Sequence, residues 1–240
     1  MRKLIFLLGM IPFLGIGQTK NVITTDRVFP KNDKIQEFEK ALANHAQKFH
    51  TGDWKWRVYE ILSGPDVGGY MIVEGPNSWE QLDTRGNISA EHLNDYEKNV
   101  LPLCTEKTST LFANFRADLS TVQLTDFTEK IAINHVFTNP GFNLDFESQV
   151  IKPAKKAWEM GNQTMAVYET SSSGPPQYLI VARYKNGWKE RDSSYRKPFM
   201  ERYNTSNGGG SYNYYMQGIQ KYVNSSWGEM LIYRADLSSK

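Results

Sequence analysis

The chain has 240 residues, with 28 Lys and Arg against 26 Asp and Glu, and 13% of its residues are aromatic. This near balance of charge gives no support to a nucleic-acid partner, which a strongly basic surface would indicate. The single cysteine, Cys104, excludes a disulfide within the chain, so stability has to come from a hydrophobic core.

The N-terminus has the pattern of a secretory signal peptide. Two basic residues at positions 2 and 3 precede an apolar run from Leu4 to Ile16, and small residues suited to cleavage precede Gln18. The run has 13 residues, whereas a membrane span needs about 20. We therefore predict that residues 1–17 are removed and that the mature chain is secreted or periplasmic, with no membrane insertion after cleavage.

The first half of the mature chain, residues 18–120, alternates between the period of strands and that of helices. The order of these periods is strand, helix, strand, strand, helix, strand. The predicted strands are residues 21–29, 56–62, 70–74 and 111–118, and the predicted helices are 34–49 and 89–102.

The second half, residues 128–240, repeats the first after a linker at 121–127. RADLS occurs at 116–120 and again at 234–238, and the segment 58–83 aligns with 167–192 through Val-Tyr-Glu, Ser-Gly-Pro and Tyr-x-Ile-Val. The same element order follows from starting points near Ile131, Phe146, Met165, Tyr178, Tyr214 and Met230. We therefore predict a tandem duplication.

The βαββαβ order is that of a ferredoxin-like unit, an antiparallel sheet with both helices on one face. Two such units bury their bare faces by packing together. The chain thus resembles the dimeric α+β barrel superfamily in its fused form, which implies an α+β fold of two tandem ferredoxin-like repeats forming a pseudo-dimeric barrel. We expect a monomeric pseudo-dimer and leave further oligomerisation open. Members of the superfamily include cofactor-independent monooxygenases, haem enzymes and isomerases, so the fold does not choose a function.

RADLS ends the last predicted strand of each half. Arg116 and Asp118 lie two residues apart, as do Arg234 and Asp236, and in an extended chain such residues point to the same side. Because the motif is present in both halves, we predict a structural ion pair at each strand end.

Glu60 and Glu169 occupy equivalent positions in the second strand of each half. If that face lines the barrel, the two carboxylates approach one another and could perform acid/base chemistry. The alternative is a pair of exposed glutamates at the strand ends.

The first strands of the two halves differ where Asp26 and Arg27 align with Asn134 and His135. Some monooxygenases of the superfamily place an Asn on this strand beside the substrate, and Asn134 resembles that position. Neighbouring strand residues face opposite sides. We predict that Asn134 faces the barrel interior as a ligand-binding residue, with Asp26 as its counterpart. His135 then lies under the helices, either as a packed side chain or as an acid/base group.

The remaining histidines do not indicate a metal site. His45 and His50 are five residues apart in a predicted helix and so lie on different faces, and His92 is expected to be solvated. Motifs for zinc hydrolysis or nucleotide binding are absent from the sequence, and the second half's helices contain no histidine to act as an axial haem ligand. We predict neither metal nor cofactor.

Three consecutive glycines, Gly208–Gly210, interrupt the repeat and predict a loop over 203–215. The loop is either a surface insertion or a lid that brings Tyr212, Tyr214 or Tyr215 over a pocket.

Three functions remain open at this stage. The first hypothesis is an extracytoplasmic protein that binds a small apolar or aromatic molecule in the barrel. The second is a cofactor-independent monooxygenase or isomerase using Asn134 and His135, assisted by Glu60 or Glu169. The third is a protein-interaction module with a filled barrel. A cavity would separate the first two hypotheses from the third.

Overall fold

In the computed structural model, which describes residues 19–240, the strands form a closed antiparallel barrel. The order around the barrel is β1-β3-β2-β8-β5-β7-β6-β4, and β4 pairs with β1 to close it. The strands are β1 (Val22–Pro30), β2 (Trp56–Ile61), β3 (Tyr70–Asn77), β4 (Cys104–Phe115), β5 (Lys130–Thr138), β6 (Met165–Thr170), β7 (Gln177–Arg183) and β8 (Val223–Tyr233). The predicted α+β class is confirmed, whereas the predicted signal peptide lies outside the described residues.

Each half of the chain contributes four neighbouring strands. The first half has the order β4-β1-β3-β2 and the second half β8-β5-β7-β6, so equivalent strands occupy equivalent places. The halves meet at two antiparallel contacts, β2 with β8 and β4 with β6.

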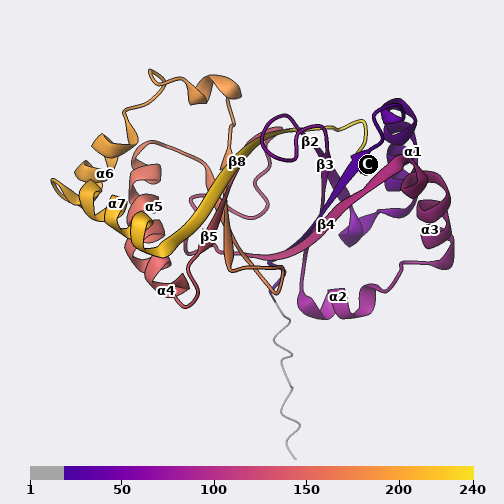
Figure 1. The fold of residues 1–240 in the computed structure, drawn as a ribbon, viewed down its shortest axis with the longest axis horizontal. Coiled ribbons are helices and arrows are strands. Elements are labelled where there is room, and N and C mark those ends of the chain that lie inside the picture. The colour runs from indigo at the N-terminus through magenta and orange to yellow at the C-terminus, as the bar shows by residue number, and fades with distance from the viewer. Residues whose placement is uncertain (1–18) are drawn as a thin grey trace, which may run out of the picture.

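The helices lie outside the barrel in two groups. Figure 1 shows α1 and α3 on one side of the strands and α4–α7 on the opposite side. The first half contributes α1 (Ile35–Phe49), α2 (Trp79–Arg85) and α3 (Ala90–Asp95), and the second half α4 (Asn143–Phe146), α5 (Lys152–Met160), α6 (Phe199–Asn207) and α7 (Ser211–Tyr222). The C-terminus lies beside α1 (Figure 1), so the last strand of the second half ends against the helices of the first.

Alternation along the strands produces one core inside the barrel and two outside it. The inner core contains side chains from all eight strands, including Ile23, Tyr59, Ile133 and Leu179. One outer core packs Phe38, Leu42 and Ala46 of α1 against the first half's strands, and the other packs the second half's helices against β6 and β7. These three side chains of α1 are fully buried at the spacing of one helix face, as the sequence period requires.

Two predicted segments differ most from the structure. β4 begins at Cys104, seven residues before the predicted start. The prediction missed this part because the first residues of the strand are mostly polar and hide its alternating period. The predicted loop over 203–215 is wrong: residues up to Asn207 belong to α6, and α7 begins at Ser211. The three glycines form only the turn between these helices.

None of the helices within residues 19–240 has the length and apolar character that crossing a bilayer requires.

Candidate functional site: a cavity inside the barrel

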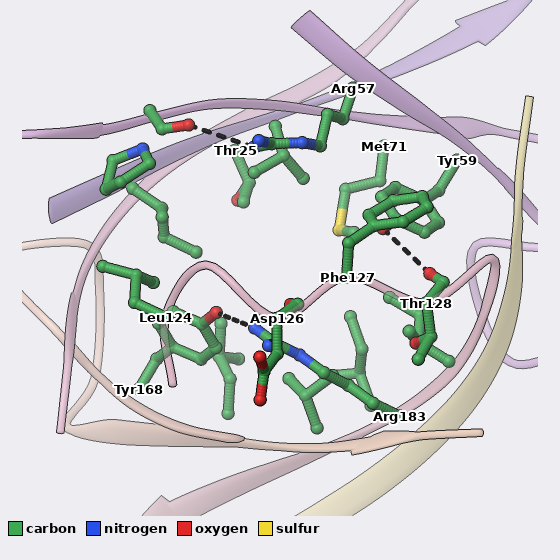
Figure 2. A pocket seen from close by; sticks show the side chains of 18 of the residues that line it. Thr25, Arg57, Tyr59, Met71, Leu124, Asp126, Phe127, Thr128, Tyr168 and Arg183 are labelled. Atoms are coloured by element: carbon green, nitrogen blue, oxygen red, sulfur yellow. Dashed lines mark hydrogen bonds between the residues drawn. The ribbon is translucent and has the colours of Figure 1, made fainter. Parts of the chain in front are cut away.

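The barrel encloses a cavity of about 90 Å³ that both halves of the chain line. Figure 2 shows the surrounding side chains pointing inward from the strands and from the linker. Most of the lining is apolar and includes Ile23, Met71, Ile131, Ile133, Leu179 and Val181. The interior is therefore not completely filled, and its walls suit a small apolar group.

The linker between the halves covers one end of this cavity. Leu124, Thr125, Asp126 and Phe127 of the linker contribute to the lining, together with the adjacent Thr128. Phe127 is nevertheless 46% exposed, so this segment lies between the cavity and solvent. The linker therefore does more than connect the two halves of the chain, because it also forms part of the barrel mouth.

Arg183 of β7 holds the linker in place. Its Nη1 donates to the backbone carbonyl oxygens of Gln123, at 3.1 Å, and of Asp126. Its Nη2 donates to the hydroxyl of Tyr168 at 2.9 Å. Burial raises the pKa of Tyr168, so this phenol is neutral at physiological pH. The guanidinium thus joins the cavity wall to the covering segment.

Arg57 of β2 supplies a second cation at the mouth. Its Nη1 donates to the carbonyl oxygen of Gly75 at 3.1 Å. Neither Arg57 nor Arg183 forms an ion pair with any carboxylate within residues 19–240. An apolar cavity with two guanidinium groups that lack a paired carboxylate favours an anionic or electron-rich ligand group.

A buried ion network crosses the barrel one layer beyond the cavity. Arg27 on β1 donates from Nη1 to Glu229 on β8 at 2.9 Å and to Asp66 at 2.8 Å. Two other strands separate β1 from β8 around the barrel, so the Arg27–Glu229 pair spans the interior. Burial would raise the pKa of Glu229, but hydrogen bonds from Arg27 and His135 outweigh it and hold the pKa below its usual value.

His135 belongs to this network. Its Nε2 lies 2.8 Å from Glu229, its Nδ1 lies 2.7 Å from the Gln177 amide, and its ring stacks on Trp227 at 3.7 Å. Burial lowers the pKa of His135, which favours the neutral ring. Both ring nitrogens are occupied, so neither is available to a ligand in this arrangement.

The predicted orientations of Asn134 and His135 are therefore reversed. Ile131 and Ile133 belong to the inner core, and His135 follows them inward by alternation. Asn134 instead points outward, where it is exposed between β7 and β8. The prediction assumed that the apolar side of this strand packs under helices, but here it faces the interior of the barrel.

Asp26, the counterpart of Asn134, also lies on the outer face. Thr110 donates a hydrogen bond to its carboxylate at 2.5 Å. Burial raises the pKa of Asp26 despite that bond. Asp26 therefore does not line the barrel cavity.

Glu60 and Glu169 do not approach one another. Glu60 accepts from Arg234 at 3.1 Å, and Glu169 accepts from Arg116 at 3.0 Å. The two carboxylates thus serve separate RADLS motifs, and neither lines the cavity. Both side chains are half-buried and ion-paired, so they are neither an acid/base pair in the barrel nor the exposed glutamates of the alternative prediction.

The three candidate tyrosines are helical. Tyr212 and Tyr215 pack against Phe199 and Tyr203 between α6 and α7, whereas Tyr214 is 74% exposed. Tyr215 and Asn134 both line an open outer groove between α6 and the barrel wall. The structure therefore brings these two candidates together, but outside the barrel.

His45, His50 and His92 do come together, contrary to the sequence-based expectation. α1 ends at Phe49, so His50 leaves the helix and turns back beside His45. His92 is buried in the first turn of α3 rather than solvated. One ring nitrogen from each lies within 4.8 Å of the others. The prediction failed because it applied helix spacing to His50, which lies just after the end of the helix.

Comparison with known structures places the fold but not the function. An anthrone oxidase-like protein has a TM-score of 0.59 at 9% identity, covering 90% of this chain and 92% of that one. A proposed monooxygenase from Fusobacterium nucleatum has 0.54 at 13%, covering 89% and 92%. Another from Lactobacillus acidophilus has 0.52 at 12%, covering 92% and 96%. The fold is therefore that of the dimeric α+β barrels. No protein family model and no curated protein matches the sequence.

Sequence reasoning missed Arg57, Arg183 and the linker. The repeat alignment did carry a signal: Arg183 aligns with Gly75, and Arg57 aligns with Ala166. Each arginine is thus present in one half only, on the side of its strand that faces the core. A charged residue in such an asymmetric position is a candidate for function.

Proposed function

We propose that this protein binds a small, mainly apolar or aromatic molecule with an acidic group inside its barrel. The observation that carries the proposal is the apolar cavity with Arg57 and Arg183 at its walls, neither paired with a carboxylate of residues 19–240. The apolar lining would hold the body of the ligand by burial, and the guanidinium groups would bind its carboxylate or phenolate.

The linker has to move when such a ligand binds. A cavity of about 90 Å³ is smaller than the one of about 150 Å³ that holds benzene in an engineered protein. The linker and the adjacent Thr128 are the part of the lining that belongs to no strand, and Arg183 holds the linker through backbone carbonyl groups. A ligand acid that recruits Arg183 would weaken those hydrogen bonds and release the segment.

A monooxygenase activity is the second candidate, and the similarity to the anthrone oxidase-like protein and to the two proposed monooxygenases favours it. Guanidinium groups beside an apolar cavity would stabilise the phenolate or enolate of an aromatic substrate. Oxygen consumption with phenolic substrates, measured with and without Arg57→Gln, tests this candidate. No consumption by a protein that binds the same phenols would leave binding as the function.

The third hypothesis, a filled barrel that serves only as an interaction module, is disfavoured by the cavity.

The compartment in which the protein resides would also decide which ligands it meets. We propose that residues 1–17 export the protein and that the mature chain begins at Gln18. N-terminal sequencing of the exported protein tests this, and a mature chain that still carries Leu4–Ile16 would contradict it.

We further propose that the two halves arose by duplication of one ferredoxin-like unit, giving a monomer with an internal pseudo-dimer. The repeated RADLS and the equivalent strand orders support this. Sedimentation of the mature chain should give a monomer mass.

The binding proposal is tested with benzoate and benzamide, which have the same size but differ in charge. We expect benzoate to bind more tightly by isothermal titration calorimetry. Arg57→Gln should reduce benzoate affinity about tenfold or more and leave benzamide unaffected. Lys55→Gln removes a charge from an exposed position just before β2 and serves as the control. Equal binding of both compounds, or no binding of either, would contradict the proposal.

A further inference from the structure

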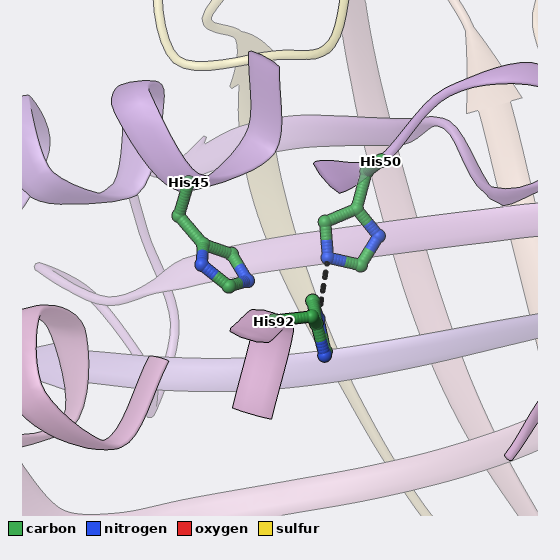
Figure 3. A group of neighbouring side chains, drawn as sticks. All are labelled: His45, His50 and His92. Atoms are coloured by element: carbon green, nitrogen blue, oxygen red, sulfur yellow. Dashed lines mark hydrogen bonds between the residues drawn. The ribbon is translucent and has the colours of Figure 1, made fainter. Parts of the chain in front are cut away.

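Three histidines from separate segments converge on the outer face of the first half. His45 comes from α1, His50 directly follows α1, and His92 comes from α3 (Figure 3). Their exposed fractions are 1%, 0% and 9%. Figure 3 shows the rings turned toward a common centre, and one nitrogen from each lies within 4.8 Å of the other two.

The hydrogen bonds around His50 fix which of its nitrogens carries the proton. Its Nδ1 lies 3.1 Å from the carbonyl oxygen of Trp54 and 3.4 Å from a carboxylate oxygen of Glu74. Both partners are acceptors, so Nδ1 must be the donor. The Nε2 of neutral His50 therefore presents a lone pair to the centre of the cluster.

His45 is oriented in the same way. Its Nδ1 lies 2.8 Å from a carboxylate oxygen of Asp95, so Nδ1 donates and Nε2 holds the lone pair. This Nε2 is buried and makes no hydrogen bond to any group within residues 19–240. A buried acceptor without a partner costs about 1–3 kcal/mol and calls for an explanation.

His92 completes a set of three. Its Nε2 lies 3.2 Å from Nε2 of His50. Two imidazole ligands of a tetrahedral zinc ion, each at about 2.0 Å from the metal, are separated by about 3.3 Å. The His50–His92 spacing therefore suits a shared metal ion, provided that His92 carries its proton on Nδ1. The nitrogens of the three rings spread over as much as 4.8 Å, so the rings would have to move closer together around the ion.

The surroundings keep all three rings neutral. Burial lowers the pKa of each, that of His45 to about 4. Protons therefore compete weakly with a metal at neutral pH. Carboxylates of Asp95 and Glu74 stand behind His45 and His50, as carboxylates commonly do behind metal-binding histidines.

We propose that His45, His50 and His92 bind one divalent transition-metal ion, with Zn²⁺ as the expected ion and water as the fourth ligand. Three imidazoles suit zinc and its neighbours, whereas Mg²⁺ and Ca²⁺ require oxygen ligands that this cluster does not offer. A bound ion would fasten the end of α1 to α3.

The metal site is separate from the barrel cavity. Trp56, which stacks on His50 at 3.5 Å, points outward from β2, whereas the next residue, Arg57, lines the cavity. The sheet thus lies between the two, so metal binding can fail while ligand binding succeeds. The competing interpretation is an aromatic cluster in which the histidines only pack.

The test is a Zn²⁺ titration of protein made without a histidine tag and stripped with a chelator. We expect one ion per chain by calorimetry, the visible absorption of tetrahedral Co²⁺ after cobalt loading, and a higher melting temperature with either metal. Zinc-edge X-ray absorption should give a first shell of nitrogen and oxygen with three imidazoles.

Variants assign the ligands. His45→Gln, His50→Gln and His92→Gln should each abolish stoichiometric binding, and Asp95→Asn should weaken it about 10- to 100-fold. The matched control is His135→Gln, which replaces the remaining histidine of the chain and should keep one ion. Absence of Zn²⁺ and Co²⁺ uptake by the wild type overturns the proposal, even if a variant fails to fold. Unchanged stoichiometry in a folded His45→Gln variant overturns it as well.

Discussion

Arg234, which follows the last strand, donates from Nη1 at 2.6 Å to the carboxylate of Glu39 in the first helix, 195 residues earlier. Arg116, the equivalent residue of the first half, donates to Glu147 of the second half, from Nη2 at 2.8 Å. RADLS thus binds the end of each half to the other half. The ion pairs within the motif, Arg116–Asp118 and Arg234–Asp236, are also present, as predicted.

We expect Arg234→Ala and Arg116→Ala each to lower the free energy of unfolding by about 1–3 kcal/mol, because each change removes charged hydrogen bonds between the halves. Asp236→Asn is the control: its side chain is 61% exposed, so its loss should cost less than about 1 kcal/mol. Urea denaturation followed by circular dichroism measures both. Equal effects of Arg234→Ala and Asp236→Asn would mean that the contact with the other half contributes nothing.

The Arg27–Glu229 pair should be essential to the barrel. Arg27→Met leaves Glu229 buried without its main cation, which should lower the free energy of unfolding by about 3–5 kcal/mol. The double variant Arg27→Met with Glu229→Gln removes the unpaired charge and should recover part of the loss. A double variant less stable than the sum of the single changes would contradict this electrostatic explanation.

His135 should make the protein sensitive to mild acid. Burial lowers the pKa of His135 below its ordinary value of 6.5, although Glu229 and Asp66 oppose the shift and Arg27 adds to it. Below about pH 6.5 the unfolded chain therefore binds a proton that the native state does not, and stability falls as the pH decreases. We expect His135→Gln to lose less stability than the wild type between pH 7 and pH 5. Parallel pH profiles of the two proteins would refute this.

Filling the cavity should block ligand binding. Val181→Phe places a ring into the space beside Leu179 and Ile133, so benzoate affinity should fall about tenfold or more while the barrel still forms. Val67→Phe adds a ring to a residue that is 61% exposed and is the matched control. Calorimetry on both variants checks the expectation. Undiminished binding to a folded Val181→Phe variant would place the ligand elsewhere.

The order of the strands and of the longest helix could be predicted because their periods are strong, whereas α2 and α6 were not predicted. α1 is an example, since Phe38, Leu42 and Ala46 have the spacing of one helix face, and all three are fully buried. The polar first part of β4 could not be predicted, because Thr105 to Ser109 show no alternation of apolar residues. Inter-strand hydrogen bonds, rather than side-chain burial, form that part of the strand.

The candidate site was harder to predict, because alternation does not tell which face of a strand points inward. Asn134 and His135 were assigned to the wrong faces for this reason. The histidine cluster depends on His50, which lies just after the end of α1 and therefore does not follow the helix spacing from His45. Contacts such as Arg27 with Glu229 join residues 202 apart, and no local pattern reveals them.

Native mass spectrometry of the mature protein, purified from its own source and freed of metal by a chelator, tests the central claim most directly. We expect a small organic acid to remain bound to the monomer, to dissociate on unfolding, and to be absent from the Val181→Phe variant. A wild-type protein that carries no organic ligand and takes up none from a panel of small aromatic acids would contradict ligand binding in the barrel.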